Sequence, residues 1–484
     1  MISLLGAMAC TQSVTRAGTG RTGVPRVGPA AGSVVVVGGG AMGPEILSRF
    51  IELAGGPDAL IIDVPTAGGD SVYADNWRGA NALKAAGAKN VIVLHTIDTA
   101  VANSAQFAEP LSRAGGVWFE GGRQWHLVDS YAGTRTERGF HDVLARGGVV
   151  GGSSAGASIL SSYMLRGARS GNAIIMAPGY EVGFGFLRGV AIDQHVVARE
   201  RLRDLADSLM PRRPDLLGIS EDEGTAWVVR GDTAEIIGRS KAFVYGGADP
   251  IDAGTPFLTL YPGDRYDLGA RRVKHRAIDG SPLTRSFVDS LFRGVRGAVT
   301  VLIAQEGKVL IDQAYGIPPH PTYMPNTTVP NFALGGLGEP FNALMSQLEP
   351  PDAGGRGPSA YPALVTRRIF MPIGARKTAV DTSGTFASNV DELYRFSLGL
   401  ESARTFARDS AGTAAAQVVR DGAAGWRADR YRGLSRLSAF GTPAGMRHAF
   451  VRLPEARVSI IILTDRDDVD ARALAERIAE RLLP

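Results

Sequence analysis

The amino-acid sequence predicts an α/β fold in which helices cover both faces of a parallel sheet, with a sharp strand-to-helix turn at the sheet edge. Short apolar runs alternate with helical patterns, as in repeated βαβ units. A G-x-S-x-G sequence follows the fifth run. Hydrophobic residues make up 44% of the chain and charged residues 21%, which is the balance of a soluble globular protein. The predicted strands are residues 33–38, 59–64, 90–95, 116–119 and 148–152.

The length of 484 residues favours two domains. We expect the first over residues 32–273, with a shift to strands and turns between Trp227 and Leu260, and the second over residues 274–484. The first strand ends in a glycine run at residues 38–40. This run does not match G-x-G-x-x-G with a downstream acid, so a dinucleotide site is not indicated. In such parallel sheets, chemistry is expected at the carboxyl ends of the strands.

The N-terminal stretch, residues 1–31, has two interpretations. Residues 1–9 are apolar and end in small residues before Cys10, the only cysteine. This resembles the end of a bacterial lipoprotein signal that lacks its charged start, with a membrane tether at Cys10 and a flexible linker over residues 11–31. The alternative is a disordered cytosolic leader. The expected compartment is therefore either that of an exported lipoprotein or periplasmic protein, or the cytoplasm.

The net charge and the cysteine content exclude several kinds of partner, bond and cofactor. The formal net charge is only +4, and no basic run is interleaved with aromatic residues, so we expect no nucleic-acid partner. A single cysteine rules out an intramolecular disulfide and a cysteine-based metal site. The sequence contains no patterned cluster of metal ligands, and we expect neither a metal nor an organic cofactor.

The most informative motif is Gly-Ser-Ser-Ala-Gly at residues 152–156, between an apolar strand and a helical stretch. This is the context of a nucleophile elbow, in which small residues allow a sharp turn that exposes a serine hydroxyl, here that of Ser154. The N-terminus of the following helix offers free N–H groups and a positive dipole end to a developing oxyanion. The sequence thus predicts a serine nucleophile at the sheet edge.

A serine nucleophile needs a base, and the base needs an orienting partner. Of seven histidines, His195 has distinctive surroundings, because it ends an apolar strand in Asp-Gln-His and precedes a charged helical stretch. Residues 221–226 lie between apolar runs and contain three acids. The order serine, histidine, acid is compatible with a catalytic triad, since triads are defined by geometry rather than by order.

Four motifs resemble those of the cyanophycinase and aspartyl dipeptidase family of serine peptidases. The Asp-Gln-His motif with its two following arginines favours the cyanophycinase branch. The resemblance implies a three-layer sandwich of the class I glutamine amidotransferase-like type, with its nucleophile elbow. The motifs are Gly-Gly-x-Gln at residues 121–124, the nucleophile motif at 151–157, Asp-Gln-His at 193–195 with Arg199 and Arg201, and Asp-Glu-x-Thr-Ala at 222–226.

The resemblance also implies residue roles. Ser154 would attack the carbonyl, His195 would carry the proton, and Glu223 would hold the imidazole. The backbone N–H groups of Gly122 and Ala155 are the candidate oxyanion hole, worth about 3 kcal/mol per donor in comparable sites. The candidate substrate-binding residues are Gln124, Asp193, Gln194, Arg199 and Arg201.

The two arginines are candidate anchors because a guanidinium binds a carboxylate bidentately. The alternative interpretation is that both arginines lie on the solvated face of a helix and bind no substrate. One position departs from the family, which has an arginine nine residues after the histidine. This sequence has Asp204 there, with Arg203 beside it. A one-residue step on a helix rotates a side chain by about 100°, so Arg203 need not substitute.

The second domain resembles the serine β-lactamase and penicillin-binding-protein family at residues 298–316, a predicted hairpin, and at residues 367–381. The Ser-x-x-Lys motif of that family falls on Gly336 and Glu339, and its late Lys/His-x-Gly element on residues 439–441. Without a nucleophile and a base, covalent catalysis by this domain is not expected. We predict a degenerate α+β, β-lactamase-like domain that packs on the first domain or helps to bind substrate.

The leading functional prediction is a serine peptidase that cuts cyanophycin, multi-L-arginyl-poly-L-aspartate, to β-Asp-Arg dipeptides. The alternatives are a related peptidase acting on other aspartyl or β-aspartyl peptides, and a catalytically inactive peptide-binding protein. The first domain keeps every triad residue whereas the second has lost its own, which argues against general decay and therefore against the inactive alternative. The family resemblance also suggests a homodimer.

Overall fold

The computed structural model describes residues 27–252, 255–295, 297–316, 331–349, 360–402, 405–406, 410–422, 424–443 and 445–483. The predicted lipoprotein signal with Cys10 lies outside these residues. Within them, no helix is both long and apolar enough to pass through a bilayer.

The predicted parallel sheet is present. Its five strands lie in the order β1-β5-β4-β2-β3, and every neighbouring pair is parallel. The sheet is buried on both faces, because Val34 and Val36 belong to one apolar cluster and Val35 and Val37 to another. The strands are β1 (Ser33–Val37), β2 (Leu60–Val64), β3 (Asn90–Val93), β4 (Gly116–Phe119) and β5 (Val149–Ser153).

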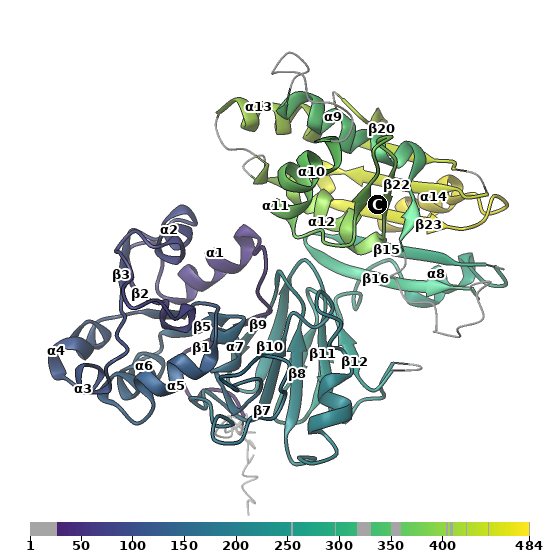
Figure 1. The fold of residues 1–484 in the computed structure, drawn as a ribbon. Coiled ribbons are helices and arrows are strands. Elements are labelled where there is room, and N and C mark those ends of the chain that lie inside the picture. Colours follow the sequence, from purple (N-terminus) through teal and green to yellow (C-terminus); the bar gives the residue numbers. More distant parts are fainter. Residues whose placement is uncertain are drawn as a thin grey trace, which may run out of the picture.

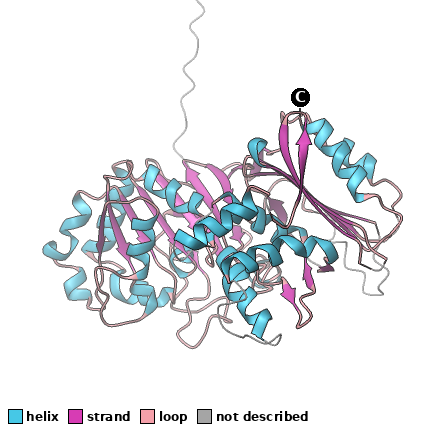
Figure 2. Cartoon of the chain, turned by 90° about the horizontal axis from the view of Figure 1, so that it is seen from above, coloured by secondary structure: helices cyan, strands magenta, loops and turns pink. Residues whose placement is uncertain are grey.

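Helices cover the two faces, as Figures 1 and 2 show. On one face α1 (Pro44–Leu53) begins with a proline and inserts Phe50 into the cluster around Val35. On the other face α6 (Arg135–Ala145) inserts Phe140 into the cluster around Val34. The other helices of this part are α2 (Arg78–Ala85), α3 (Thr99–Ala102), α4 (Ala105–Ala108), α5 (Gln124–Tyr131) and α7 (Ala155–Ser158).

Antiparallel strands extend this sheet beyond β1 to a total of nine strands. The added strands are β9 (Thr225–Arg230), β10 (Thr233–Gly238), β13 (Arg265–Asp267) and β14 (Arg272–His275). The domain boundary predicted after residue 273 falls inside β14, which pairs with β13. Strands up to β14 form two sheets and strands from β15 onward form two others. We refer to these parts as the N-terminal module and the C-terminal module.

A second sheet of the N-terminal module carries the histidine motif. Its order is β12-β11-β8-β7-β6, with β6, β7 and β8 parallel. The helical stretch expected directly after His195 is wrong: residues 196–203 form turns and irregular chain, and helical structure is confined to a short π-helix at Leu205–Leu209 and the residue before it. The physical reason is that the N–H groups of Val197 and Ala198 donate to the carboxylate of Asp222. The strands are β6 (Ser161–Met164), β7 (Leu187–Gln194), β8 (Leu217–Glu221), β11 (Ala242–Tyr245) and β12 (Leu258–Leu260).

The C-terminal module is built on a six-stranded antiparallel sheet in the order β16-β15-β23-β22-β21-β20. The predicted hairpin of β15 (Val299–Gln305) and β16 (Lys308–Tyr315) is present, and Glu306 and Gly307 in its turn both have positive φ. Side chains of β15 alternate between two cores, with Leu302 beside α12 and Ile303 beside α14.

The remaining elements of this module pack around the six-stranded sheet (Figure 1). Its other strands are β20 (Arg427–Tyr431), β21 (Leu434–Gly441), β22 (His448–Leu453) and β23 (Val458–Thr464), with β17 (Phe332–Ala333), β18 (Ala379–Val380) and β19 (Phe386–Ser388) in a small separate sheet. Its helices are α8 (Arg285–Leu291), α9 (Glu339–Leu348), α10 (Tyr361–Val365), α11 (Met371–Ile373), α12 (Val390–Glu401), α13 (Ser410–Arg420) and α14 (Ala471–Leu482).

Candidate active site

Ser154 lies at the turn between β5 and α7, where its backbone has φ 57° and ψ −114°. A non-glycine residue at this position is strained, as in a nucleophile elbow. The flanking glycines permit the turn: a Cβ on Gly152 would lie 2.2 Å from the Gly156 carbonyl oxygen, and one on Gly156 would lie 2.1 Å from the Phe119 carbonyl oxygen. Larger residues would push the elbow away from the sheet.

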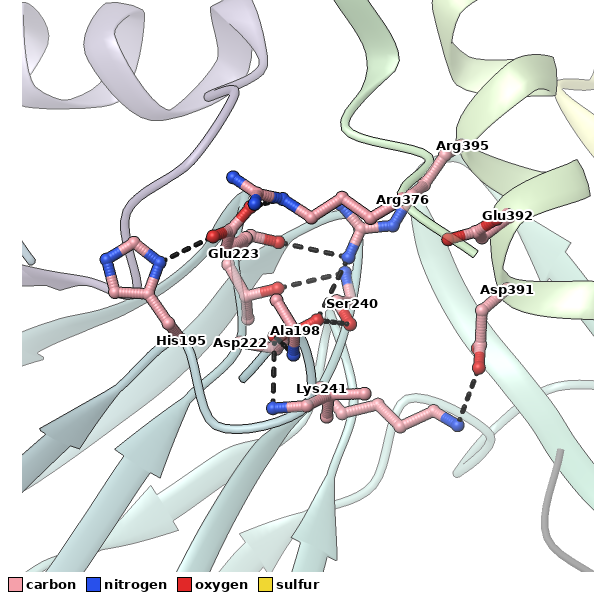
Figure 3. Close-up of polar contacts among 12 residues, drawn as sticks. His195, Ala198, Asp222, Glu223, Ser240, Lys241, Arg376, Asp391, Glu392 and Arg395 are labelled. Carbon is pink, nitrogen blue, oxygen red and sulfur yellow. Dashed lines mark hydrogen bonds and ion pairs between the residues drawn. The ribbon is translucent and has the colours of Figure 1, made fainter. Parts of the chain in front are cut away.

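His195 and Glu223 meet Ser154 from two other strand ends. The Nε2 atom of His195 is 2.8 Å from the Ser154 hydroxyl, and its Nδ1 atom is 2.6 Å from Oε1 of Glu223. Figure 3 shows the second of these contacts. An ionised carboxylate can only accept, so Nδ1 carries the proton and Nε2 is left to accept from the serine hydroxyl. The three predicted residues therefore form one hydrogen-bonded chain.

The pKa values suit this arrangement. Burial is the main reason that the pKa of His195 lies below its ordinary value, although the hydrogen bond with Glu223 opposes the shift. Burial alone would raise the pKa of Glu223, but His195 and Arg376 outweigh it and hold the pKa below its usual range. At neutral pH the site thus combines a neutral imidazole with an ionised glutamate, the states that general-base catalysis requires.

The glycine run after β1 packs directly on this chain. A Cβ on Gly39 would lie 2.3 Å from Cε1 of His195, and a Cβ on Gly40 would lie 2.3 Å from Oε2 of Glu223. Both glycines have positive φ. The backbone also ties the strand ends together, since the His195 N–H donates to Gly38 and the Gly224 N–H donates to Gly39. The role of this run was not predicted from the sequence, although its place directly after a parallel strand was a signal for it.

The candidate oxyanion donors lie beside the elbow. Ala155 is the first residue of α7, directly after Ser154. The loop after β4 reaches the same place, because a Cβ on Gly121 would lie 3.3 Å from that of Ser154. Gly122 has φ 149° and a Cβ there would lie 2.0 Å from the Ala67 carbonyl oxygen, so only glycine fits. The roles of Gly122 and Ala155 stay predictions.

The polar residues predicted to line the substrate cleft are buried. Gln124 donates from its side chain to the Leu165 carbonyl oxygen at 2.5 Å, and Gln194 donates to the Ser158 hydroxyl at 3.2 Å. Asp193 is fully buried and receives two hydrogen bonds of 2.7 Å from Arg166. In this structure these side chains form hydrogen bonds with other residues of the protein, and their contact with substrate stays a prediction.

Asp204, the departure from the family pattern, also binds Arg166, with an oxygen 2.6 Å from Nη2. The structure thus joins the buried Asp193 and Arg166 to the partly exposed Asp204 in one ion network that could not be predicted from the sequence. Arg166 has φ 58° and follows β6. No local pattern marks such a residue, because its two partners come from distant segments.

Arg199 and Arg201 lie on the turns that follow His195. Arg199 is exposed, and its charge interacts with Glu223 and Arg376. Arg201 is half-buried, and its Nη1 atom is a buried donor with no hydrogen-bond partner among the described residues. A cation with an unused donor beside the triad is suited to an anionic ligand.

Asp222 organises the loop next to the triad. One of its oxygens accepts from the N–H groups of Val197 and Ala198, and the other accepts from the Ser240 hydroxyl at 2.9 Å and from Arg395 at 3.1 Å. Figure 3 shows Asp222 with Ala198, Ser240 and Arg395. Asp222 therefore links the turn after His195 to the strand end that carries Glu223. No role for Asp222 was predicted from the sequence.

Two carboxyl groups lie close together: Asp63, which is fully buried in β2, and the half-buried Glu120, which directly follows β4. A Cβ on Gly79 would lie 2.2 Å from Oε1 of Glu120 and 3.0 Å from Oδ2 of Asp63. Burial, with the nearby charge of Glu120, raises the pKa of Asp63 from 3.8 to about 8. Because this folded-state pKa exceeds the unfolded one, the stability that the proton provides is present at low pH and is lost as pH rises from about 4 to about 8.

We therefore expect Asp63→Asn to remove part of this pH dependence. The variant should be more stable than the wild type at pH 8, with a gain in the free energy of unfolding of about 2 kcal/mol, and should show little gain at pH 4. Urea denaturation at both pH values measures this difference. Asp58→Asn, which removes an exposed partner of Lys89, serves as control. The prediction would be contradicted if the free energies of unfolding of wild type and Asp63→Asn differed by the same amount at pH 4 and at pH 8.

Comparison with known proteins finds relatives of the N-terminal module. The model of Peptidase family S51 matches residues 34–237. A cyanophycinase from Geminocystis herdmanii (strain PCC 6308) is 31% identical over 222 residues, which cover 44% of this chain and 80% of the relative. A cyanophycinase from Synechococcus elongatus is 30% identical over 273 residues, covering 51% of this chain and 82% of the relative. A solved structure of a peptidase from an acI-B1 Actinobacterium shows 25% identity and a TM-score of 0.39, covering 49% of this chain and 97% of that one.

These relatives define the class of the protein as a hydrolase that acts on peptides. The chain belongs to peptidase family S51, the family of the cyanophycinases. The matches cover about half of the chain, and the family model ends at residue 237, before the C-terminal module begins.

Proposed function

We propose that this protein is a serine-type peptidase that hydrolyses cyanophycin to β-Asp-Arg dipeptides with a Ser154-His195-Glu223 triad. The observation that carries the proposal is the chain of two hydrogen bonds, 2.8 Å from Ser154 to His195 and 2.6 Å from His195 to Glu223. A strained elbow, an ionised acid and a neutral base together match the requirements for an activated serine.

In the proposed reaction the Ser154 oxygen attacks the scissile carbonyl while Nε2 of His195 takes the hydroxyl proton. Glu223 stabilises the imidazolium that forms, and the N–H groups of Gly122 and Ala155 donate to the oxyanion. His195 then gives its proton to the leaving amine, the C–N bond breaks, and an ester on Ser154 remains. Water, deprotonated by His195, hydrolyses the ester and restores the serine.

The proposed substrate follows from the cations beside the triad and from the names of the relatives. Cyanophycin is a poly-aspartate chain with arginine joined to each side-chain carboxyl, and each arginine keeps its own carboxylate. Arg199 and the unpartnered Nη1 of Arg201 would bind such a carboxylate. The cyanophycinases that match are about 30% identical to this chain.

A second candidate substrate is another aspartyl or β-aspartyl peptide. The observation that favours it is Asp204, which neutralises part of the charge of Arg166 and leaves the cleft with one cation fewer than the family pattern. A cleft with fewer cations would have a weaker preference for a polymer that carries many carboxylates.

The test is an assay of the purified full chain on insoluble cyanophycin, with the released products identified by mass spectrometry. We expect β-Asp-Arg from the wild type, and release at background level from Ser154→Ala because the nucleophile is lost. Ser48→Ala, on the exposed face of α1, controls for the loss of a serine hydroxyl elsewhere.

Each outcome of this assay decides between the alternatives. No release from cyanophycin, together with cleavage of β-aspartyl dipeptides, would favour the second substrate. Equal release by Ser154→Ala would reject the triad. Binding of cyanophycin without any cleavage would favour the inactive peptide-binding alternative.

For the C-terminal module we propose an inactive, β-lactamase-like remnant. Gly336 and Glu339, which occupy the positions of the Ser-x-x-Lys motif, lie at the turn that leads into α9. A Cβ on Gly336 would lie 2.4 Å from the Phe440 carbonyl oxygen, so the backbone leaves no room for a nucleophilic side chain. The antiparallel sheet with helices on both faces supports the α+β class. The tether at Cys10 and the homodimer stay predictions.

A further inference from the structure

An arginine of the C-terminal module contacts the carboxylate of the proposed triad. Arg376 follows α11, and its Nε atom lies 2.6 Å from Oε2 of Glu223. The other oxygen of the same carboxylate, Oε1, faces Nδ1 of His195 at 2.6 Å. Figure 3 shows Glu223 between the two residues. The two oxygens of this buried glutamate are therefore held by different modules of the chain.

The loop that carries Arg376 is docked on the N-terminal module at a second point. Arg395 of α12 is 4% exposed, and its Nη2 atom donates to Oδ2 of Asp222 and to the backbone oxygen of Glu223, both at 3.1 Å. A Cβ on Gly374, two residues before Arg376, would lie 3.3 Å from Nη1 of Arg395 and 3.6 Å from the Cβ of Ala41. The loop therefore has a defined position against the end of the glycine run.

Buried charges behind the loop hold the modules together. Lys241, next to the Ser240 that binds Asp222, lies 2.6 Å from Asp312 of β16 and 3.1 Å from Asp391 of α12. All three carry little exposed surface, so separating the modules would leave charges without their partners. The position of Arg376 is thus determined by a packed interface, although its own side chain is 57% exposed.

The surroundings of Glu223 give Arg376 a specific electrostatic effect. The side chain of Glu223 is 2% exposed, so little solvent screens its attraction to a cation that contacts its outer oxygen, Oε2. The charged or titratable groups that face Glu223 are His195 and Arg199 from the turn after β7, Asp222 beside it, Arg376 from the loop after α11, and Arg395 from α12. Of these, Arg376 is the one in ionic contact with the free carboxylate oxygen.

We propose that Arg376 is a positioning residue of the peptidase site: it fixes Oε2 of Glu223 so that Oε1 stays aligned with Nδ1 of His195, and its charge keeps the glutamate ionised. The proposal rests on the triad proposed above. It gives the C-terminal module, which is proposed to be inactive by itself, a direct part in the activity of the N-terminal module.

The test compares Arg376→Ala, Arg376→Lys and the wild type in two assays over a range of pH. One assay measures kcat and KM on the peptide substrate, and the other measures the rate of labelling of Ser154 by a fluorophosphonate, which needs an activated serine but no particular peptide. We expect Arg376→Ala to lower kcat and the labelling rate by about tenfold with KM nearly unchanged, because alignment is lost while substrate contacts remain.

The pH dependence provides a readout that a purely structural role would not move. Removing a cation raises the proton affinity of the coupled His195-Glu223 pair, so the acid limb of both pH profiles should shift to higher pH in Arg376→Ala. Arg376→Lys keeps the charge and should return the limb to its wild-type position, with part of the rate. Arg447→Ala, which removes another exposed loop arginine of the same module, should change neither.

The outcomes separate this proposal from the proposed function. Labelling without release from cyanophycin would reject the substrate while the comparison of labelling rates still tests Arg376. Equal labelling rates and unshifted profiles for wild type and Arg376→Ala would overturn the positioning role and leave the triad in place. A wild type that neither labels nor cleaves would overturn both. A loss of rate that Arg376→Lys does not recover, with no shift in pH, would assign Arg376 to packing only.

Discussion

Glu223→Gln is expected to lower kcat/KM for peptide hydrolysis by about 10⁴-fold, although the side chain keeps its shape. The reason lies in the two partners of the carboxylate. The cationic Nε of Arg376 lies 2.6 Å from Oε2, so the amide oxygen of the variant would turn to Arg376 and the amide NH₂ toward His195. Nδ1 of His195 must then accept, its proton moves to Nε2, and Nε2 can no longer take the proton of Ser154.

Steady-state kinetics on the released dipeptide measure this loss. Glu221→Gln is the matched control, because Glu221 is fully buried two residues upstream and burial, with Asp193, raises its pKa well above the ordinary value. Burial therefore favours the uncharged form of Glu221, whose two buried oxygens have no hydrogen-bond partner among the described residues, and an amide replaces it with nearly the same shape. Near-normal activity of Glu223→Gln would show that His195 does not depend on this carboxylate.

Arg166→Met is expected to lower the free energy of unfolding by about 3–5 kcal/mol. Arg166 is 2% exposed and forms hydrogen bonds of 2.7 Å to both oxygens of Asp193, which has no exposed surface. Methionine preserves much of the aliphatic stem but leaves Asp193 as a buried charge without its partner. The same change frees Asp204, which is 33% exposed and can turn to water.

Urea denaturation followed by near-ultraviolet circular dichroism measures this effect. Arg169→Met is the control, because the Arg169–Asp129 pair is exposed and such pairs contribute at most about 1 kcal/mol. The double variant Arg166→Met with Asp193→Asn should recover part of the loss, since it removes the uncompensated charge. If Arg166→Met were as stable as Arg169→Met, the ion network would not support the fold.

The position of Ser154 could be predicted from the sequence because its signal is local. A buried strand, a turn of small residues and a helix are contiguous there, and each depends on residues within a few positions. The five parallel strands were predictable for the same reason, since a run such as residues 34–37 is apolar at every position and must be covered on both faces. The hairpin at residues 298–316 had a clear turn signal.

The partners of Ser154 had weaker signals. His195 and Glu223 lie 41 and 69 positions away in the chain, and their strands belong to a second sheet and to an antiparallel extension that periodicity did not predict. Their strand-end positions made them candidates, and the family motifs chose among them. The turns after His195 were predicted as helical because their composition is helix-like, whereas the tertiary contacts of Asp222 decide their backbone.

By itself the sequence determined the α/β class of the N-terminal module and the elbow at Ser154, because both depend on neighbouring residues. Only the tertiary structure decided what holds the proposed triad in place. Gly39 and Gly40 against His195 and Glu223, Arg166 between Asp193 and Asp204, and Arg376 on the outer oxygen of Glu223 all join segments that are distant in the chain. Such contacts leave no pattern in a single sequence, because an arginine that will be buried against a carboxylate has the same local surroundings as one that faces water.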